Sequence, residues 1–425
     1  MTATADTDIT DTAAAAPALD IAHVRAAFPA LAEPTLAGWA FFENAGGSYP
    51  CRQVLRRLTE FYTRTKVQPY APYPAARRAG AWMDEAVERL APWLGVAPDW
   101  LHVGPSTSQN TYVLAQAFRR HLRGRAGAEI VVTEQDHEAN SGVWRRLAEE
   151  GITIREWQVD PGTGRLDPAA LDALLSERTA LVAFPHCSNI VGAINPVAEI
   201  TAKVRAAGAV SVVDGVSYAP HGLPDVAALG ADVYLFSAYK TYGPHQGVMV
   251  ADPALVDRLP CEGHGFNAGY RAKRLTPAGP DHAQVAALAG IADYFDDLHS
   301  HHFASNAAAD GRAARVRGLM RGAEIARAAP LLAYLEGRND LRVLGPTDPA
   351  GRAPTVSIAH ARPGEALAAA LAEHRIMAGG GDFYAPRVIR AMGEDPEHGV
   401  LRLSFVHYTS AEEIDRLIAA LDRVL

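Results

Sequence analysis

Lys240 lies in the segment of this chain that is best equipped for chemistry. Residues 233–236, Val-Tyr-Leu-Phe, predict a short buried strand, and Gly243 and Pro244 predict a tight loop just beyond the lysine. Lys240 is therefore expected where a strand ends. A lysine that enters a dry site must be paired, deprotonated or used covalently. The alternative is an ordinary lysine in an exposed loop.

Asp214 stands at the end of a second predicted strand, residues 209–213, Ala-Val-Ser-Val-Val. In a parallel sheet the carboxyl ends of the strands share one edge, where ligands bind. A lysine that can form a Schiff base and an aspartate that can keep a pyridinium nitrogen protonated are the groups that pyridoxal phosphate (PLP) requires from a protein. The pair therefore predicts PLP as the cofactor.

Two segments carry a resemblance to a known family. Asp214-Gly-Val-Ser-Tyr-Ala-Pro-His221 and Ser237-Ala-Tyr-Lys-Thr-Tyr-Gly-Pro244 resemble the class V aminotransferases, which include cysteine desulfurases, selenocysteine lyases and isopenicillin N epimerase-like proteins. The similarity extends from about residue 28 to the C-terminus. It implies an α/β protein of PLP-dependent fold type I: a large domain with a mostly parallel seven-stranded sheet, a small C-terminal α+β domain, and a homodimer with the active site near the subunit interface.

The phosphate end of such a cofactor is expected at residues 101–110, Leu-His-Val-Gly-Pro-Ser-Thr-Ser-Gln-Asn, which pass from a strand to a helix. A helix N-terminus with free N–H groups and hydroxyl side chains binds anions, although the same pattern also serves as a simple N-cap. The resemblance makes Ser106, Thr107 and Ser108 candidate phosphate ligands, with Thr107 the best of them. Ser237 and Tyr239 join them, and the Tyr239 hydroxyl replaces the histidine that desulfurases carry before the lysine.

The cofactor ring is expected to contact three further residues. His137 lies in Glu-Gln-Asp-His-Glu-Ala-Asn, and the resemblance implies that its imidazole stacks on the ring; a structural histidine is the alternative. Asn189 lies in His-Cys-Ser-Asn-Ile-Val-Gly and is implied to hydrogen-bond the ring oxygen, while Ser217 stands where desulfurases have a glutamine. Cys187, beside Asn189, is expected to be a buried packing residue.

Arg402 is the expected anchor for the substrate. Strand alternation places Leu401 and Leu403 on one face and Arg402 on the other, away from the small-domain core. The resemblance implies that the guanidinium holds the substrate α-carboxylate in two parallel hydrogen bonds, a geometry that lysine cannot reproduce. An exposed arginine in a salt bridge is the alternative.

Two loops are expected to complete the substrate side. Asn44 and Ala45 belong to Glu-Asn-Ala-Gly-Gly-Ser, which is either a turn or the element that lines the substrate pocket in the family. Asp382 and Tyr384 belong to Gly-Asp-Phe-Tyr-Ala, in the place where desulfurases carry their nucleophilic cysteine.

That place contains no cysteine. Residues 376–386 carry none, and none occurs after Cys261. Without a thiolate there is no acceptor for a persulfide. A second departure is in residues 276–280, where the family's Gly-Thr-Pro is degraded, and either Thr276 or Gly279 would have to reach the partner's phosphate.

Composition bounds the remaining possibilities. With 425 residues, 48% hydrophobic and 21% charged, the chain predicts a globular protein of two or three domains without a membrane span. A net charge of −8 without a basic stripe argues against nucleic acid and favours a small-molecule partner, which the resemblance implies to be an amino acid. Three scattered cysteines predict neither disulfides nor a metal site and suit the cytoplasm.

The expected domain order is a disordered leader (1–19), an N-terminal arm (20–49), a large PLP-binding domain (50–295) and a small domain (296–425) that includes the arm. Two separate helices are expected at 304–328 and 330–336. Lys240, Asp214 and His137 are the expected catalytic residues of an enzyme that removes the Cα proton of an amino acid. β-Elimination without a persulfide is preferred over transamination or epimerisation, and a non-enzymatic binding protein is the remaining alternative.

Overall fold

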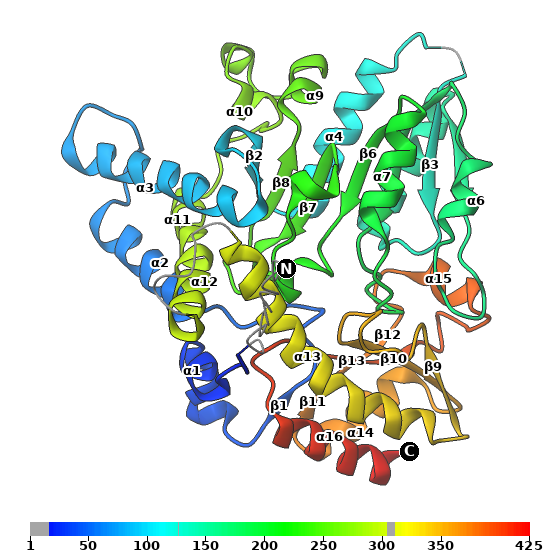
Figure 1. Ribbon diagram of the computed structural model, residues 1–425. Helices are drawn as coiled ribbons and strands as arrows, with labels where there is room; N and C mark the ends of the chain where they lie inside the picture. Colours follow the sequence, from blue (N-terminus) through cyan, green and yellow to red (C-terminus); the bar gives the residue numbers. More distant parts are fainter. Residues whose placement is uncertain (1–16, 126, 304–310) are drawn as a thin grey trace, which may run out of the picture.

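A seven-stranded sheet forms the centre of the computed structural model, which describes residues 17–125, 127–303 and 311–425 (Figure 1). Most of the expected leader, residues 1–16, lies outside the described residues. The strand order is β2-β8-β7-β6-β5-β3-β4. The strands are β2 (Leu101–Gly104), β3 (Glu129–Thr133), β4 (Thr153–Trp157), β5 (Thr179–Pro185), β6 (Val210–Asp214), β7 (Val233–Ser237) and β8 (Gly247–Ala251).

The predicted mostly parallel, seven-stranded sheet is confirmed. The pairs β7–β6, β6–β5, β5–β3 and β3–β4 are parallel, whereas β8 runs antiparallel to both β7 and β2. Asp214 is the last residue of β6, and Lys240 lies three residues beyond the end of β7. The parallel strands therefore deliver both residues to the same edge.

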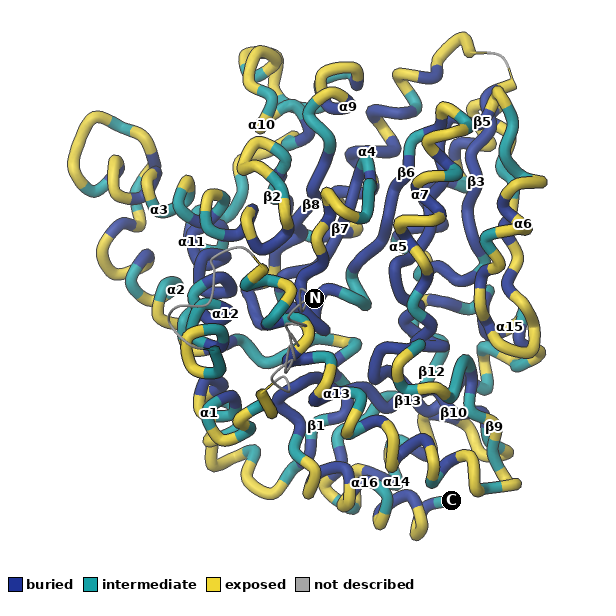
Figure 2. The backbone as a smooth tube through the Cα atoms, in the orientation of Figure 1, coloured by how far each residue is buried: buried dark blue, intermediate teal, exposed yellow. Residues whose placement is uncertain are grey.

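Helices cover both faces of this sheet, and that burial explains the continuous apolar strands. Alternate residues of one strand enter different cores, as Tyr234 and Phe236 do on one face and Val233 and Leu235 on the other. All of these strands except the edge strand β4 are buried along most of their length (Figure 2). The surrounding helices are α4 (Thr107–His121), α5 (Glu138–Arg145), α6 (Pro168–Asp172), α7 (Val197–Ala206), α8 (Val226–Leu229), α9 (Pro253–Arg258) and α10 (Arg271–Arg274).

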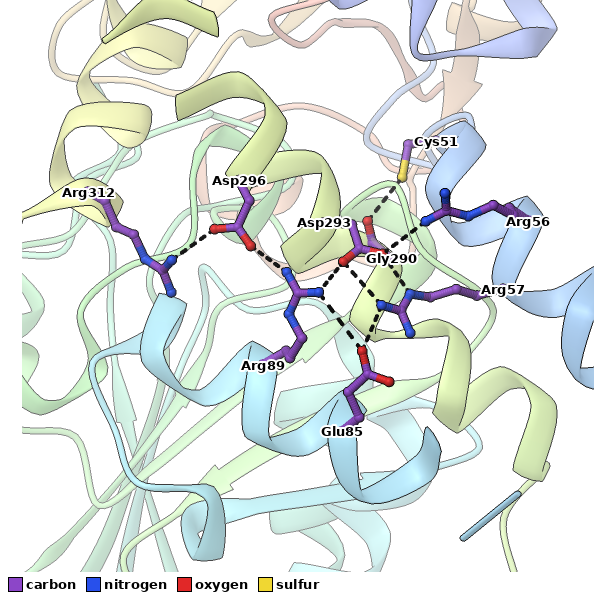
Figure 3. A network of polar contacts seen from close by, with 9 residues as sticks. All are labelled: Cys51, Arg56, Arg57, Glu85, Arg89, Gly290, Asp293, Asp296 and Arg312. Carbon is purple, nitrogen blue, oxygen red and sulfur yellow. Dashed lines mark hydrogen bonds and ion pairs between the residues drawn. The ribbon is translucent and has the colours of Figure 1, made fainter. Parts of the chain in front are cut away.

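A helical layer beside the sheet is joined by ion pairs (Figure 3). It contains α2 (Arg52–Arg64), α3 (Pro74–Leu90), α11 (His282–Ala287) and α12 (Ala289–His302). Arg57 on α2 contacts Asp293 on α12 at 2.6 Å and Glu85 on α3 at 2.8 Å. Arg89 pairs with Asp293 and Asp296. These shared carboxylates join the three helices α2, α3 and α12.

A second, smaller unit carries its own core. Its sheet has the order β12-β13-β10-β9, and helices α13, α14 and α16 pack on it. The arm reaches this unit through β1, which pairs in parallel with β11. The elements are α1 (Ile21–Ala26), β1 (Ala40–Phe41), α13 (Arg312–Glu336), β9 (Leu341–Leu344), β10 (Thr355–His360), α14 (Gly364–Glu373), β11 (Ile376–Met377), β12 (Gly379–Gly381), α15 (Pro386–Ala391), β13 (Val400–Ser404) and α16 (Ala411–Val424).

Two expectations differ from the structure. The prediction of separate helices ending and starting at Pro330 is wrong, because α13 continues through that proline; residues 304–310 of the first predicted helix lie outside the described residues. A proline costs about 3 kcal/mol inside a helix, yet Met320 is buried in the large core and Leu331 in the small one, and this packing on both sides holds α13 together. The expected division at residue 295 falls inside α12. Within the described ranges, no helix combines the length and apolar character needed to cross a membrane.

Candidate active site

Lys240 ends a short 3-10 turn, Ala238–Lys240, directly after β7. Burial of the ammonium, together with the positive charge of Arg402, lowers the Lys240 pKa to about 8. The negative charges of Asp214 and Glu43 act in the opposite direction. A lysine with a pKa this close to neutral has a substantial fraction of free amine, which is the reactive form.

Asp214 stands beside it at the end of β6 and is only 7% exposed. Burial raises the Asp214 pKa, while the Val216 N–H, which donates to Oδ1 at 2.9 Å, and the charge of Lys240 lower it. A second buried carboxylate, Asp136, accepts from the Asn140 amide at 2.8 Å. Burial raises the Asp136 pKa to about 7, and the Asp214 charge adds to that rise. The motifs did not single out Asp136; its place directly before His137 was the available signal.

His137 is the N-cap residue of α5. Its Nδ1 accepts the Ala139 N–H at 3.0 Å, so the ring is a neutral imidazole with its proton on Nε2. Burial lowers the His137 pKa to about 4, and the charges of Lys240 and Arg402 contribute. A neutral ring in this position is suited to stacking on a flat ligand.

The N-terminus of α4 forms another wall. Ser106 caps this helix, and its Oγ accepts the Gln109 N–H at 3.1 Å, so this hydroxyl is already engaged. The Thr107 and Ser237 hydroxyls lie 2.8 Å apart and are buried, whereas Ser108 is exposed. A Cβ at Gly247 would lie 2.4 Å from the Thr107 nitrogen, so only glycine lets β8 approach this helix end.

One cavity brings nine of the predicted cofactor residues together. Asn189 reaches it from the loop after β5, and its Oδ1 is buried without a partner in the described part of the chain. The Tyr239 ring packs at 4.7 Å on His245 and lies under the Lys240 ammonium. The cavity is lined by Thr107, Ser108, His137, Ala139, Pro185, Cys187, Asn189, Asp214, Val216, Ser217, Ser237, Tyr239 and Lys240.

These groups fit PLP. The Lys240 amine, the Asp214 carboxylate and the neutral His137 imidazole line the same cavity. The N-terminus of α4 supplies an anion site, and the buried Asn189 Oδ1, which has no partner among the described residues, can accept a hydrogen bond from the cofactor. Ser106, by contrast, uses its hydroxyl for capping and does not line the cavity.

Arg402 is buried, with 3% of its surface exposed, whereas the alternative interpretation required an exposed arginine. It does form an ion pair, as that interpretation also required. Its Nη2 donates to Glu43 Oε1 at 2.7 Å, and its Nη1 donates to the backbone oxygen of Asn189 at 3.3 Å. The expected separation from the small-domain core is confirmed, since Leu401 and Leu403 belong to that core and Arg402 does not. The sequence motifs did not assign a role to Glu43, although it directly precedes Asn44.

Four further residues that the sequence singled out divide into two groups. Asn44 and Ala45 line a small recess behind Lys240, but the Asn44 amide bonds to the Ser404 carbonyl and to the Tyr408 hydroxyl, so it joins the arm to β13. Thr276 and Gly279 lie away from the cavity, in a surface groove beside the α2–α3 loop.

The loop between β12 and α15 lies against Arg402 and His137. Asp382 Oδ1 accepts the Tyr384 N–H at 3.0 Å, so Asp382 stabilises the turn. Tyr384 is 71% exposed and lies 5.5 Å from the His137 ring. Phe383, which the sequence did not single out, covers the Arg402 guanidinium at 3.7 Å. The left-handed backbone at Phe383 (φ 49°) is held by the Asn189 amide, which donates to its carbonyl.

Comparison with known proteins identifies the family of this chain. Residues 40–308 match the family model described as aminotransferase class-V. The chain is 34% identical to the aminotransferase-like protein FGM3 of Gibberella zeae, over 95% of this chain and 98% of the relative. It is 32% identical to a cysteine desulfurase of Serratia proteamaculans, over 65% of this chain and 72% of the relative.

Solved structures share the fold. The cysteine desulfurase CsdA of Escherichia coli superposes with a TM-score of 0.80 at 22% identity, covering 95% of this chain and 98% of that one. A cysteine desulfurase from Thermococcus onnurineus gives 0.81 at 22% identity, with 94% and 96% covered. The fold is thus PLP-dependent fold type I. The chain belongs to the class-V aminotransferase family and is a PLP-dependent enzyme.

Proposed function

We propose that this enzyme binds PLP in the cavity at the carboxyl edge of the sheet and removes the Cα proton of a small amine-bearing substrate, an amino acid or a simple derivative of one. The observation that carries the proposal is the meeting of Lys240, Asp214 and His137 around one cavity, with the Lys240 pKa lowered to about 8. A binding protein without chemistry has no need of a reactive amine there.

Each wall of the cavity has a proposed part in holding the cofactor. Lys240 is the point of covalent attachment, Asp214 holds the proton on the ring nitrogen, and His137 stacks on the ring. Asn189 and Ser217 contact the ring oxygen. Thr107, Ser108, Ser237 and Tyr239 hold the phosphate with the N-terminus of α4. When bound, PLP supplies an aldehyde for the substrate amine and a ring that withdraws electrons from Cα.

Lys240 is also the proposed base. As a base, Lys240 would act from the same edge of the cavity, and with a pKa of about 8 its free amine can both accept and return a proton near neutral pH. His137, whose pKa is about 4, stays neutral and has no comparable role as a base. Arg402 is the proposed contact for the carboxyl group of the substrate, or for the group that replaces it in a derivative.

Loss of a β-substituent without persulfide chemistry is the outcome we favour. The loop that would carry a nucleophilic cysteine presents Phe383 and Tyr384 instead. Cys187 lines the cavity, but burial raises its pKa to about 12, and burial does the same for Cys51. Neither thiol is therefore ionised to the extent that sulfur transfer demands. Transamination and epimerisation begin with the same proton removal and are the alternatives.

We further propose a homodimer. Tyr70, Phe266 and Tyr270 are 59%, 79% and 64% exposed, and Tyr70 and Phe266 line the groove that also contains Thr276 and Gly279. Exposed aromatic side chains in such numbers are typical of a covered surface. The occupant that the resemblance favours is a second copy of the chain. Three free cysteines support the reducing cytoplasm as the compartment.

A panel of amino acids tests the proposed chemistry. Purified holoprotein and a Lys240→Ala variant are mixed with each compound, and the cofactor spectrum, keto acid and ammonia are recorded together. Release of keto acid and ammonia in equal amounts, with no partner keto acid added, indicates elimination. An aminated cofactor left without ammonia indicates transamination. The absence of any spectral change or product with every amine would contradict the proposed function.

A further inference from the structure

The Arg402 guanidinium is already paired inside the protein. Its Nη2 donates to Glu43 Oε1 at 2.7 Å, and the side chains of Arg402 and Glu43 are 4% and 28% exposed. The Phe383 ring covers one face of the guanidinium. A free carboxylate arriving at Arg402 would therefore be a second negative charge competing for one positive charge, in a place where little water is available to screen the repulsion.

The backbone builds a place for the Glu43 carboxylate. A Cβ at Gly46 would lie 2.7 Å from Oε1, and a Cβ at Gly379 would lie 2.5 Å from Oε2. Gly379 on β12 is the direct cross-strand neighbour of Arg402 on β13, and Glu43 itself forms a parallel bridge with Ser404. Strand register thus places both side chains, so their contact is a constructed feature and not a chance surface pair.

The pair lies next to the reacting amine. Arg402 lowers and Glu43 raises the Lys240 pKa, so both charges act on that amine, and the backbone oxygen that Arg402 contacts belongs to Asn189 in the cavity wall. Neither side chain lines the cavity itself, and the ion pair contacts the site through the Asn189 backbone in the cavity wall.

The pair also retains one unfilled acceptor and one unfilled donor. Glu43 Oε2 and Arg402 Nε are both buried, and neither has a hydrogen-bond partner within the described residues. Buried polar atoms without partners cost free energy, and a ligand that satisfies them gains affinity. A carboxamide offers a carbonyl oxygen to the donor and an N–H to the acceptor, whereas a carboxylate has no N–H to offer.

We propose that Glu43 determines the substrate specificity of this site: its carboxylate occupies the place on Arg402 that a substrate carboxylate would take, so the site selects amino-acid amides over free amino acids. The inference rests on the proposed function, because it concerns the substrate of the same PLP site. In this arrangement Arg402 contacts the amide oxygen and Glu43 accepts the amide N–H.

Spectral titration of the holoenzyme tests the inference without requiring turnover. L-alanine and L-serine are compared with L-alaninamide and L-serinamide, at concentrations corrected for the fraction of unprotonated amine. The wild type should bind the amides at least about tenfold more tightly than the acids. Glu43→Gln removes the negative charge at nearly constant size and should tighten binding of the acids by about tenfold or more. Glu43→Ala should change the affinity for the acids in the same direction.

Glu394→Gln is the matched control. Glu394 pairs with Arg342 in the same small unit at 3.1 Å and is 29% exposed, close to the value for Glu43, but it lies away from the cavity. This variant should retain the wild-type preference. The ratio of the wild-type affinities for acids and for amides decides the inference even if both Glu43 variants fail to fold.

Two results separate the inference from the proposed function. Wild-type protein that responds to both classes but binds the acids as tightly as the amides would overturn the role of Glu43 and leave the proposed function intact, as would Glu43 variants with unchanged acid binding. A cofactor spectrum that responds to no amine at all would overturn the proposed function, and the inference with it.

Discussion

The reactivity of Lys240 offers the sharpest test of the site. The enclosed position of Lys240 and the nearby Arg402 lower its pKa from 10.5 to about 8. At pH 7 about one amine in ten is then unprotonated, against about one in 3,000 for an ordinary lysine, which is a difference of about 300-fold. The corresponding free-energy difference between the protonation states is about 3 kcal/mol.

Competitive labelling measures this directly. Trace acetic anhydride modifies the PLP-free protein across a range of pH, and mass spectrometry follows the peptides that contain each of the four lysines, Lys66, Lys203, Lys240 and Lys273. Burial slows the labelling of Lys240 at every pH but does not move the midpoint of its pH profile. That midpoint should lie near 8, because the amine gains reactivity as pH rises through its pKa.

Lys203 serves as the internal control, since it pairs with Asp172 at 2.7 Å on the surface. Arg402→Met should raise the Lys240 midpoint, because it removes a positive charge and frees Glu43, and both changes stabilise the ammonium. Arg342→Met, a surface change, should leave it unaltered. A Lys240 midpoint equal to that of Lys203 would refute the reasoning about burial and charge.

Three other predictions use standard assays. Asp214→Asn should keep PLP, as absorbance would show, but lower turnover by about 100-fold or more because a neutral partner no longer stabilises the protonated ring nitrogen; a near-normal rate would exclude that role. Incubation with cysteine should leave no persulfide on any cysteine, since burial keeps Cys51 and Cys187 protonated and Cys261 does not line the cavity; labelled thiol in step with alanine release would reinstate desulfuration. Phe266→Ser combined with Tyr270→Ser should shift the mass from dimer to monomer by light scattering, and an unchanged dimer would place the interface elsewhere.

The sequence by itself was sufficient to predict that Asp214 and Lys240 lie together at the carboxyl edge of the sheet. The apolar runs before Asp214 and Lys240 predicted short buried strands, and parallel strands bring their carboxyl ends together. His137, Asn189 and Thr107 each lie in a short motif of adjacent residues, so their places in the cavity wall were also predictable from the sequence.

Tertiary structure alone decided what Arg402 contacts. Glu43 is 359 residues away in sequence and becomes its partner only because the arm, β12 and β13 assemble side by side. The lowered pKa of Lys240 arises in the same way, from burial and charges contributed by distant elements. The continuity of α13 through Pro330 likewise depends on two cores that lie on either side of it. In each case the deciding energy comes from contacts between segments far apart in the chain, which no local pattern records.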